Sequence, residues 1–550
     1  MTTKIAGVEI KIGGAALDPT YTASLLEVRV QNNLALPDTF LVRIADPGLA
    51  HVDQVPFDVG ADVDISFEAA DGASMKKVFT GQIAAVEPEF GEHGVVLAAR
   101  GYDASHKLHR TSSNQTYQNM TYGDIAQKVI SRAGLRAGTV DSAGGVQDFV
   151  QQSGETDWAF LSRLAKRIDF ELVAEDGKVH FRKPVAGATV NLDWGQNLVS
   201  FRPRVTGVQQ LDDVVVRGWD RKAKQAIQAS AKNGTLGSTI GIKQSSLTSA
   251  LGKGSVHITD RQVSTDDEAQ ALADGILSRL ANSYVDGDGW CHGNPSLTAG
   301  SKVQIGGVGN RFGGTYTLSS TTHVYGGTTG YRTLFTISGR ASGGLVDMLD
   351  GGRRRDRTWG AQLVVGIVTN NNDPDKVGRV RVKFPALGDD VESWWAPVIA
   401  PNAGKDRGQL MVPQVGDSVL VGFEQGDVRF PYVLGSLWNG TDTPGAVVAT
   451  DGSYVLQSDK EIRLTSKGVI KVKSEKDMTV ETDGKIQQKA SGDYTVDGKS
   501  VTVKGSSSVS IEASSDLTIK GSSVTVQAQG SLSLKASGTV QVSGSQVMLG

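Results

Sequence analysis

The fold of this chain is decided by its C-terminal stretch, 521-GSSVTVQAQGSLSLKASGTVQVSGSQVMLG-550. Apolar residues come in pairs separated by one polar residue, as in Val524, Thr525 and Val526, and the pairs recur every seven or eight positions. Between the pairs, almost no residue is large enough to build a core. The first question that the sequence raises is therefore what this segment packs against.

The same pattern extends back to residue 462. Doublets begin at Ile462, Ile470, Met478, Ile486, Tyr494, Val501, Val509, Leu517, Val524, Leu532, Val540 and Val547, so eleven steps cover 85 residues, a mean of a little under eight. Most doublets have an apolar second member two residues on: Leu464, Val472, Val480, Val496, Val503, Ile511, Ile519, Val526, Leu534, Val542 and Leu549. A fixed short period of this kind predicts a solenoid.

A single chain cannot enclose these pairs with one turn per repeat. Eight residues of strand cover about 26 Å, and closing that path into a coil would bring facing walls closer than the roughly 10 Å that packed sheets require. Fixing eight residues costs about 8 to 16 kcal/mol of backbone entropy, whereas burying two apolar side chains returns about 3 to 6 kcal/mol. An isolated repeat is therefore not expected to hold.

Three chains that each supply one strand per level would form a triangular prism, with apolar residues inside and every strand edge paired along the axis. We expect the core of this intertwined trimeric β-helix to contain Ile462, Leu464, Ile470, Val472, Val480, Val503, Ile511, Ile519, Val526, Leu534 and Val542. Two alternatives stay open: a single-chain β-helix with three repeats per coil, and an antiparallel meander with turns at Asp483-Gly484 and Asp497-Gly498.

Length and composition predict several β-rich modules. At about 150 residues per domain, 550 residues correspond to three or four domains. The 67 glycines and the aromatic content of 6% favour strands and turns over large helical cores. A net charge of −3 gives no attraction to nucleic acid, so no nucleic-acid partner is expected. Cys291 is the single cysteine, which rules out a disulfide within the chain.

The amino terminus, MTTKIAGVEIKIGG, lacks the apolar core of a secretory signal. No apolar run reaches the roughly 18 residues of a membrane-spanning helix. We therefore expect the protein to be made in the cytoplasm without a signal peptide, and to need other components to act outside the cell.

Residues 1–350 are predicted to form a β-rich domain with short helices. A half-buried hairpin is expected in 21–47, with one face of each strand formed by Leu26, Val28, Val30, Phe40, Val42 and Ile44. Apolar stripes at helical spacing predict amphipathic helices in 122–134, 156–168 and 266–284, the second of them capped by Thr156. Each helix is short and is expected to lie on a sheet.

A linker is predicted at 351–360, where Arg353 to Arg357 are all charged. A solvated connection explains this run better than a nucleic-acid patch. Residues 361–445 contain short strands separated by Gly and Asp turns, and five such strands in about eighty residues predict a barrel of the OB type. The periodic tail then occupies 446–550.

No pattern for bond chemistry stands out in the sequence. His106 and His109 have helical spacing but lack a further Cys or His nearby, and Lys376 stands where the loop NNNDPDKVG would need glycine to bind calcium. Trp394 and Trp395 are expected to be buried at a collar between copies, in preference to stacking on a ligand. We therefore predict no catalytic residue, no metal and no cofactor.

The three modules in this order resemble the VgrG family of contractile injection systems, in which the baseplate hub and tail spike of phages are fused in one chain. The matching stretches of the first module are ARGYDASHKLHR (99–110), QSGETDWAFLSRLAKRIDFEL (152–172) and GNPSLTAGSKVQIGGVGNRFGGTYTLSSTTHVY (293–325). Those of the second are GIVTNNNDPDKVGRVRVKFP (366–385), SWWAPVIAP (393–401) and MVPQVGDSVLVGFEQGDVRFPYVLGSLWNG (411–440). The resemblance extends over essentially the whole chain.

This resemblance implies a homotrimer in a phage-tail-like machine. Its first module would be the hub facing the inner tube protein and the baseplate proteins, its barrels would form a collar, and its tail would be a needle that punctures the target membrane. Family members often carry a PAAR-type tip protein on the blunt end of the needle, which corresponds here to Val547, Met548, Leu549 and Gly550. Effector cargo is a further partner that the resemblance implies, and the injection particle can be released or delivered outside the cell.

The chain differs from the enzymatic members of that family. Residues 440–451 leave no room for a lysozyme domain between barrel and needle, and no toxin follows Gly550, so a mechanical role without enzyme activity is expected. Two other functions remain to be weighed. A trimeric surface fibre or adhesin would need an export signal, and a polysaccharide-processing β-helix would need aromatic platforms, whereas Tyr494 is the one aromatic residue in 455–550.

Overall fold

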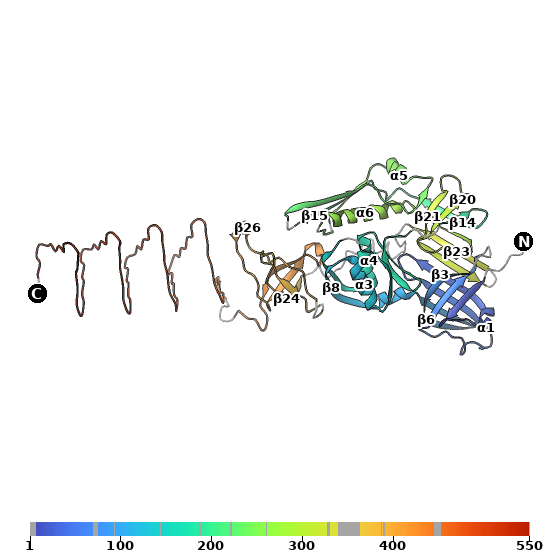
Figure 1. The fold of residues 1–550 in the computed structure, drawn as a ribbon, viewed down its shortest axis with the longest axis horizontal. Coiled ribbons are helices and arrows are strands. Elements are labelled where there is room, and N and C mark those ends of the chain that lie inside the picture. The colour runs from blue at the N-terminus through green and yellow to red at the C-terminus, as the bar shows by residue number, and fades with distance from the viewer. Residues whose placement is uncertain are drawn as a thin grey trace. The chain divides into compact units, whose positions relative to one another are not determined.

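The computed structural model describes residues 7–69, 75–92, 94–142, 145–185, 189–220, 223–259, 261–263, 265–326, 330–338, 363–386, 388, 391–444 and 453–548. The chain divides into two compact units, Met1–Ser453 and Tyr454–Gly550. Strands dominate the first unit (Figure 1), which confirms the prediction of a mainly β fold. The predicted linker at 351–360 lies outside the described residues.

An antiparallel sheet of eleven strands forms the base of the N-terminal region, which we define as residues 7–338. Its order is β14 (Leu198–Val205), β19 (Val285–His292), β23 (Gly330–Ile337), β22 (Ser320–Gly326), β3 (Leu25–Asn33), β4 (Thr39–Asp46), β7 (Gly94–Tyr102), β6 (Lys76–Gly91), β5 (Asp62–Phe67), β1 (Val8–Ile12) and β2 (Ala15–Ala16). Helix α1 (Pro19–Ala23) precedes β3. Strands from both ends of the region meet here, because β22 pairs with β3.

The predicted hairpin is the pair β3 and β4, in which Val28 lies opposite Val42 and Val30 opposite Phe40. The prediction that Leu26 shares their buried face is wrong. A β-bulge shifts the register between Leu25 and Glu27, so Leu25 is buried and Leu26 points outward. Because side chains alternate along a strand, one extra residue is enough to exchange their faces.

The predicted helices in 122–134 and 156–168 are confirmed as α3 (Tyr122–Arg132) and α4 (Asp157–Arg167). Thr156 caps α4 as expected, and Thr121 and Asp124 form a capping box at the start of α3. The helices pack with short strands: β8 (Ser112–Met120), β9 (Arg136–Val140), β10 (Gln147–Thr156), β11 (Glu171–Glu175) and β12 (Lys178–Arg182). The one-turn elements η1 (Ala104–His106) and α2 (Lys107–Arg110) lead into this layer.

The third predicted helix is confirmed as α6 (Asp266–Asn282), which lies along the sheet of β16 (Gln225–Ala231), β15 (Asp213–Asp220) and β18 (Ser255–Ile258) (Figure 1). The remaining elements of the region are β13 (Thr189–Asp193), β17 (Thr239–Ile240), α5 (Gln244–Leu251), β20 (Lys302–Gly306) and β21 (Gly314–Thr317). The apolar side of helix α6 packs against the sheet of β15 and β16, and the first turn of the helix makes contacts elsewhere.

The barrel module, residues 363–444, contains a four-stranded sheet in the order β25 (Arg381–Lys383), β24 (Val364–Asn370), β28 (Ser418–Phe423) and β29 (Pro431–Leu437). A fifth segment connects the two edges through single bridges, from Glu392 to Lys383 and from Val398 to Val433. A short hairpin, β26 (Ala403–Gly404) and β27 (Arg407–Gly408), and the turn η3 (Glu424–Gly426) complete the module. The fifth predicted strand is therefore present as bridges that close the sheet around a small valine-rich core.

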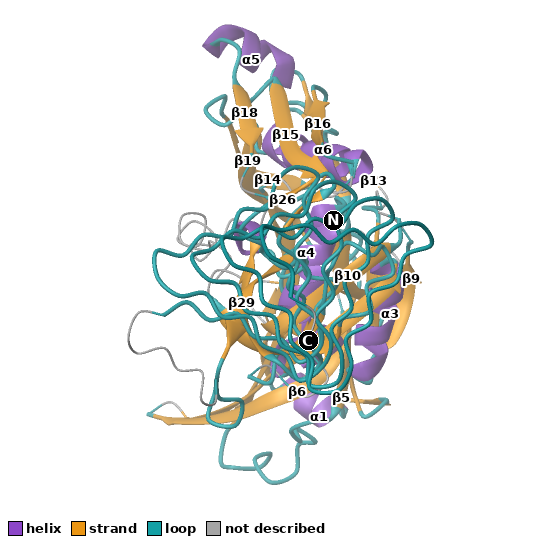
Figure 2. Ribbon diagram, turned by 90° about the vertical axis from the view of Figure 1, so that its left-hand side faces the viewer, coloured by secondary structure: helices purple, strands orange, loops and turns teal. Residues whose placement is uncertain are grey.

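The tail, described over residues 453–548, forms neither helix nor strand in this single copy. The chain winds through a series of wide turns, which appear as an open wave in Figure 1 and as overlapping loops in Figure 2. Among these residues no backbone hydrogen bond joins one turn to the next. One copy therefore forms neither the single-chain β-helix nor the meander, and the three-chain prism remains a prediction.

Candidate functional site

A tight turn of the barrel module presents two charged side chains toward the N-terminal region. The turn is held by backbone hydrogen bonds from Asp427 N to Glu424 O and from Phe430 N to Asp427 O. The carboxylate of Asp427 accepts hydrogen bonds from the backbone and the guanidinium group of Arg429, at 2.9 to 3.2 Å. This pairing fixes the direction in which Arg429 leaves the barrel.

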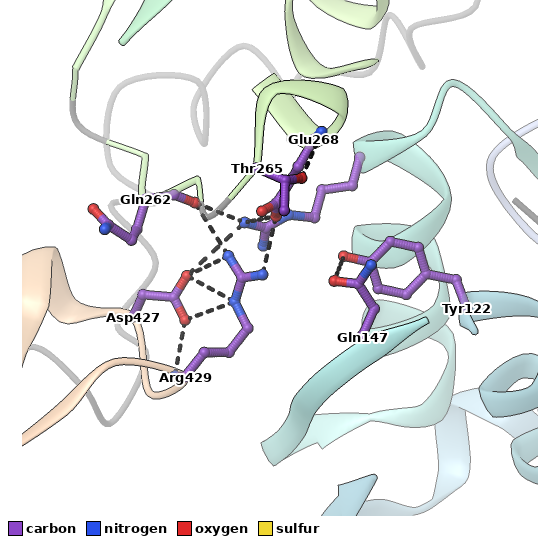
Figure 3. A network of polar contacts seen from close by, with 8 residues as sticks. Tyr122, Gln147, Gln262, Thr265, Glu268, Asp427 and Arg429 are labelled. Carbon is purple, nitrogen blue, oxygen red and sulfur yellow. Dashed lines mark hydrogen bonds and ion pairs between the residues drawn. The ribbon is translucent and has the colours of Figure 1, made fainter. Parts of the chain in front are cut away.

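Arg429 reaches the first turn of α6 and the segment that precedes this helix. Its Nη1 donates to Oε1 of Glu268 at 2.9 Å, and its Nη2 donates to the carbonyl oxygen of Gln262 at 3.1 Å (Figure 3). Arg167 approaches the same two acceptors, with its Nη2 at 3.3 Å from Glu268 and 3.2 Å from the carbonyl oxygen of Gln262. We call this network the junction, comprising Arg167, Gln262, Glu268, Asp427 and Arg429.

The junction balances two guanidinium groups against two carboxylates within a largely buried volume. The side chains of Arg429 and Glu268 are only 10% and 13% exposed. Burial alone would raise the pKa of Asp427, but Arg429 and Arg167 hold that pKa at about 2. Burial would likewise lower the pKa of Arg429, but Asp427 and Glu268 raise it above its ordinary value. Asp427 and Arg429 are therefore charged at neutral pH, while burial lowers the pKa of Arg167 from its ordinary value.

The N-terminal side of the junction is supported by helix capping and by a small hollow. Thr265 caps α6 by accepting a hydrogen bond from Glu268 N at 3.1 Å, which places Glu268 in the positive first turn of the helix. The hydroxyl of Tyr122 donates to Gln147 at 3.3 Å on the far side of the hollow (Figure 3). The cap fixes the position of Glu268 beside Arg167 and Arg429, an arrangement suited to rigid coupling of two modules.

The tail contrasts with the first unit, because no residue from 453 to 548 is buried. Every large apolar side chain of the predicted doublets in this range is between 50% and 74% exposed. Ordinary soluble folds do not leave such a regular apolar surface uncovered. All eleven predicted core residues of the tail share this exposure, so one copy brings none of them into a core.

The residues predicted to bind a tip protein are only partly described. Val547 is 50% exposed and Met548 is 83% exposed, whereas Leu549 and Gly550 lie outside the described residues. The assignment of these four positions remains a prediction.

The other residues weighed for chemistry have ordinary protein partners. His106 Nδ1 lies 2.7 Å from the carbonyl oxygen of Asp103, and His109 stacks on Trp158. Within the described residues no cluster of three or more His, Cys, Asp or Glu side chains is placed to hold a metal. The thiol of Cys291 is buried, and burial raises its pKa to about 12. A buried thiol of this kind is a poor nucleophile.

In the loop NNNDPDKVG and at the tryptophan pair, the polar and aromatic side chains contact arginines of the barrel module itself. Asp373 accepts from the backbone of Asp375, Val377 and Arg379 and from the Arg379 guanidinium group, as expected for a hairpin turn. The guanidinium group of Arg381 lies 5.7 Å from the Trp394 ring and 6.0 Å from the Trp395 ring. These contacts stabilise the barrel surface by cation–π attraction.

Sequence reasoning missed the junction. Arg429 belongs to the quoted stretch 411–440, but its partners lie 161 residues away at Glu268 and 167 residues away at Gln262. A charged residue in a turn ordinarily predicts a solvated surface, so the sequence carries no signal that would pair these positions.

Of the helices in the described residues, none combines the length and apolar character needed to cross a membrane.

Curated relatives match short stretches of the chain. The type VI secretion system spike protein VgrG2a of Pseudomonas aeruginosa is 33% identical over 96 residues, which cover 16% of this chain and 11% of that protein. The spike protein VgrG5 of the same organism is 40% identical over 91 residues, covering 16% of this chain and 12% of that protein. The match therefore spans about a tenth of the length of these relatives.

A solved structure matches the fold over a much larger share. The E. coli c3393 protein, a type VI secretion component with structural similarity to the T4 bacteriophage tail proteins gp27 and gp5, covers 78% of this chain and 99% of its own, with a TM-score of 0.50 and 16% identity. At that identity the likeness concerns the fold alone.

Two protein families match successive parts of the chain. Residues 2–326 match the Alg8 N-terminal domain, and residues 364–438 match the type VI secretion system/phage-baseplate injector OB domain. The injector OB match, the spike relatives and the shared fold confirm the resemblance to VgrG-type spike proteins. The chain belongs to the Alg8 N-terminal domain family, joined in the same polypeptide to an injector OB domain.

Proposed function

We propose that this chain is the hub and spike of a contractile, phage-tail-like injection system and that it acts as a homotrimer. The N-terminal region faces the inner tube and the baseplate, the barrel modules form a collar, and the three tails together form a needle. Contraction of a sheath drives the needle through the target envelope. The work is mechanical and involves no bond chemistry.

One observation carries this proposal: a regular series of exposed apolar doublets follows an injector OB domain in the same chain. Each doublet presents two apolar side chains on one face of an extended segment, because residues i and i+2 share a face. Two further copies would cover these faces and pair the backbone groups that one copy leaves unpaired. The result is a stiff, fully hydrogen-bonded rod.

The junction supports the same role. A needle that transmits force must be fixed to its base, and Arg429 connects the barrel turn to α6 and, through Gln262 and Glu268, to the end of α4. Ion pairs that are mostly buried are screened little by salt and hold a defined geometry. The barrel and the N-terminal region can thus move as one body during contraction.

Partners follow from this role. We expect contacts with an inner tube protein, baseplate proteins and a PAAR-type tip protein at Val547, Met548, Leu549 and Gly550, with effector cargo as a further passenger. The protein is made in the cytoplasm and becomes part of a particle that is released or delivered outside the cell. It meets the target membrane during injection.

The experiment that tests this function uses particles isolated from producing cells. The chain should be found at one end of each particle, at three copies per particle, by labelling with an antibody against the tail and by quantitative mass spectrometry. Particles whose chain is truncated at Asp451 should assemble but fail to permeabilise target cells. Absence of the chain from the particles, or full permeabilisation by truncated particles, would contradict the proposal.

A further inference from the structure

One doublet of the tail departs from the apolar pattern. At the second position of each doublet the sequence has Leu, Val or Ile, except at residue 488, where it has Gln. The doublet that follows is also unusual, because it begins with Tyr494, the one aromatic residue among the twelve first positions. Gln488 and Tyr494 are thus neighbouring exceptions in an otherwise uniform series.

The structure connects these two exceptions directly. The hydroxyl of Tyr494 donates a hydrogen bond to Oε1 of Gln488, six residues away. Both side chains therefore lie on the same side of the winding chain. The amide of Gln488 keeps two N–H donors and part of its acceptor capacity for groups outside its own chain.

Within each of two parts of the tail, the apolar pattern by itself identifies no particular level. From Ile462 to Tyr494 the doublets are eight residues apart, so a slip of one repeat superimposes apolar positions. Beyond Val501 the steps repeat in blocks of 23 residues, since 524 − 501 and 547 − 524 are both 23. A slip of three repeats in this part also places every apolar doublet against another. Each of these two parts, taken by itself, therefore tolerates a slipped alignment, and the seven-residue step from Tyr494 to Val501 separates their two periods.

We infer that Gln488, together with Tyr494, forms a polar level that sets the alignment of the three chains in the tail. This inference rests on the proposed three-chain needle. At the correct alignment the three Gln488 amides meet at one level, where each can donate to the next in a closed ring and accept from Tyr494. A chain shifted by one repeat places its Gln488 beside Val480 or Val496 of its partners.

The physical basis is the asymmetry of buried polar groups. Burying an amide that keeps hydrogen-bond partners costs little free energy. An amide buried among valines costs more, because it loses its hydrogen bonds to water and gains none in return. A single buried polar residue in an apolar seam fixes alignment and copy number in coiled coils, at some expense of stability. The same balance between stability and specific alignment is expected here. The apolar doublets stabilise the needle, and the one polar level selects the alignment of its three chains.

The test uses the full chain carrying V503C, which places a thiol at a predicted core position. Native Cys291 is buried in the N-terminal region, and the chain without V503C serves as its control. When alignment is correct the three introduced thiols meet at one level, so an oxidant or a short bifunctional thiol reagent links the copies. After thermal unfolding and refolding, adding Q488V should lower the cross-linked fraction by about twofold or more and raise the melting temperature of the tail.

A matched variant moves the polar level without changing composition. V472Q combined with Q488V places the exception two repeats earlier and should restore the cross-linked fraction to that of the V503C parent. Unchanged cross-linking in Q488V, or a lower melting temperature, would overturn the inference, since Gln488 would then not oppose mixed alignments. A V503C parent chain that is monomeric by mass would overturn the three-chain needle itself. This outcome is distinct from the cross-linking result, because cross-linking is compared only among chains that form trimers.

Discussion

Arg429 of the barrel module and Glu268 of helix α6 form a 2.9 Å ion pair across 161 residues of chain. The pair is largely buried, and Asp427 and Arg167 complete it on either side. A buried charge that loses its partner is destabilised by several kcal/mol. The network therefore favours the one geometry of the barrel and the N-terminal region in which all four charged groups keep their partners.

Replacing Arg429 with Ala should weaken this attachment strongly. The change leaves Asp427 and Glu268 facing a single guanidinium group in a buried site, and removal of one partner from such a network costs about 3 kcal/mol. Hydrogen exchange of the first-turn amides of α6 should become faster, and the free energy of unfolding of the first unit should fall. Arg202→Ala removes an exposed pair with Asp288 and should cost less than about 1 kcal/mol. Equal effects of the two changes would show that the junction contributes no more than a surface pair.

The junction should also respond to acid through Asp427. Its pKa in the folded protein is about 2, below its ordinary value of 3.8. A lowered carboxyl pKa contributes stability that is fully present above about pH 4 and is lost as the pH falls through 2. The loss is on the order of 2 kcal/mol. Denaturant unfolding at successive pH values should show it, and D427N should be less stable at pH 7 but change less between pH 4 and 2.

His323 gives the N-terminal region a second acid response at higher pH. The ring is fully buried, with Nε2 at 2.9 Å from the carbonyl oxygen of Leu297 and Nδ1 at 2.7 Å from the Tyr331 hydroxyl. Burial lowers its pKa from 6.5 to about 4. The neutral ring therefore contributes stability that is complete above pH 6.5 and declines toward pH 4, by up to about 3 kcal/mol. H323Q should flatten this part of the curve of unfolding free energy against pH, and an unchanged slope would contradict the assignment.

The faces of the tail can be tested within one doublet. Val526→Asp would place three like charges at one level of the proposed apolar core, so trimers with an ordered tail should not form. Thr525→Asp is its matched control, since adjacent residues of an extended segment point to opposite sides. The control should yield trimers as the parent does, by sedimentation or light scattering. Normal trimers from Val526→Asp would mean that Val526 points outward.

Local patterns in the sequence predicted local structure well. The stripes and caps of α3, α4 and α6 depend on neighbours within a few residues, and so does the pairing of Val28 with Val42. The bulge beside Leu25 was not predictable, because an extra residue in a strand is specified by packing and leaves the alternating pattern almost unchanged. The order of the eleven-stranded sheet, in which β22 lies beside β3, likewise depends on contacts between distant segments.

The candidate sites divide in the same way. The doublets of the tail are visible in the sequence because they repeat, and their exposure in one copy agrees with the expectation that a lone repeat cannot enclose them. The junction depends on the meeting of Arg429, Glu268 and Arg167 from separate modules. Neither the residue types nor their spacing predicts this contact, since charged residues like these are common on turns and at helix ends.

We propose that the apolar doublets of the tail are covered by two further copies of the same chain. The mass of the purified full chain in solution, measured by light scattering, tests it most directly. Three copies per particle give an expected mass of three times 58.0 kDa, which should fall to that of single chains only when the tail is disrupted. A stable particle of 58.0 kDa with an ordered tail would contradict it.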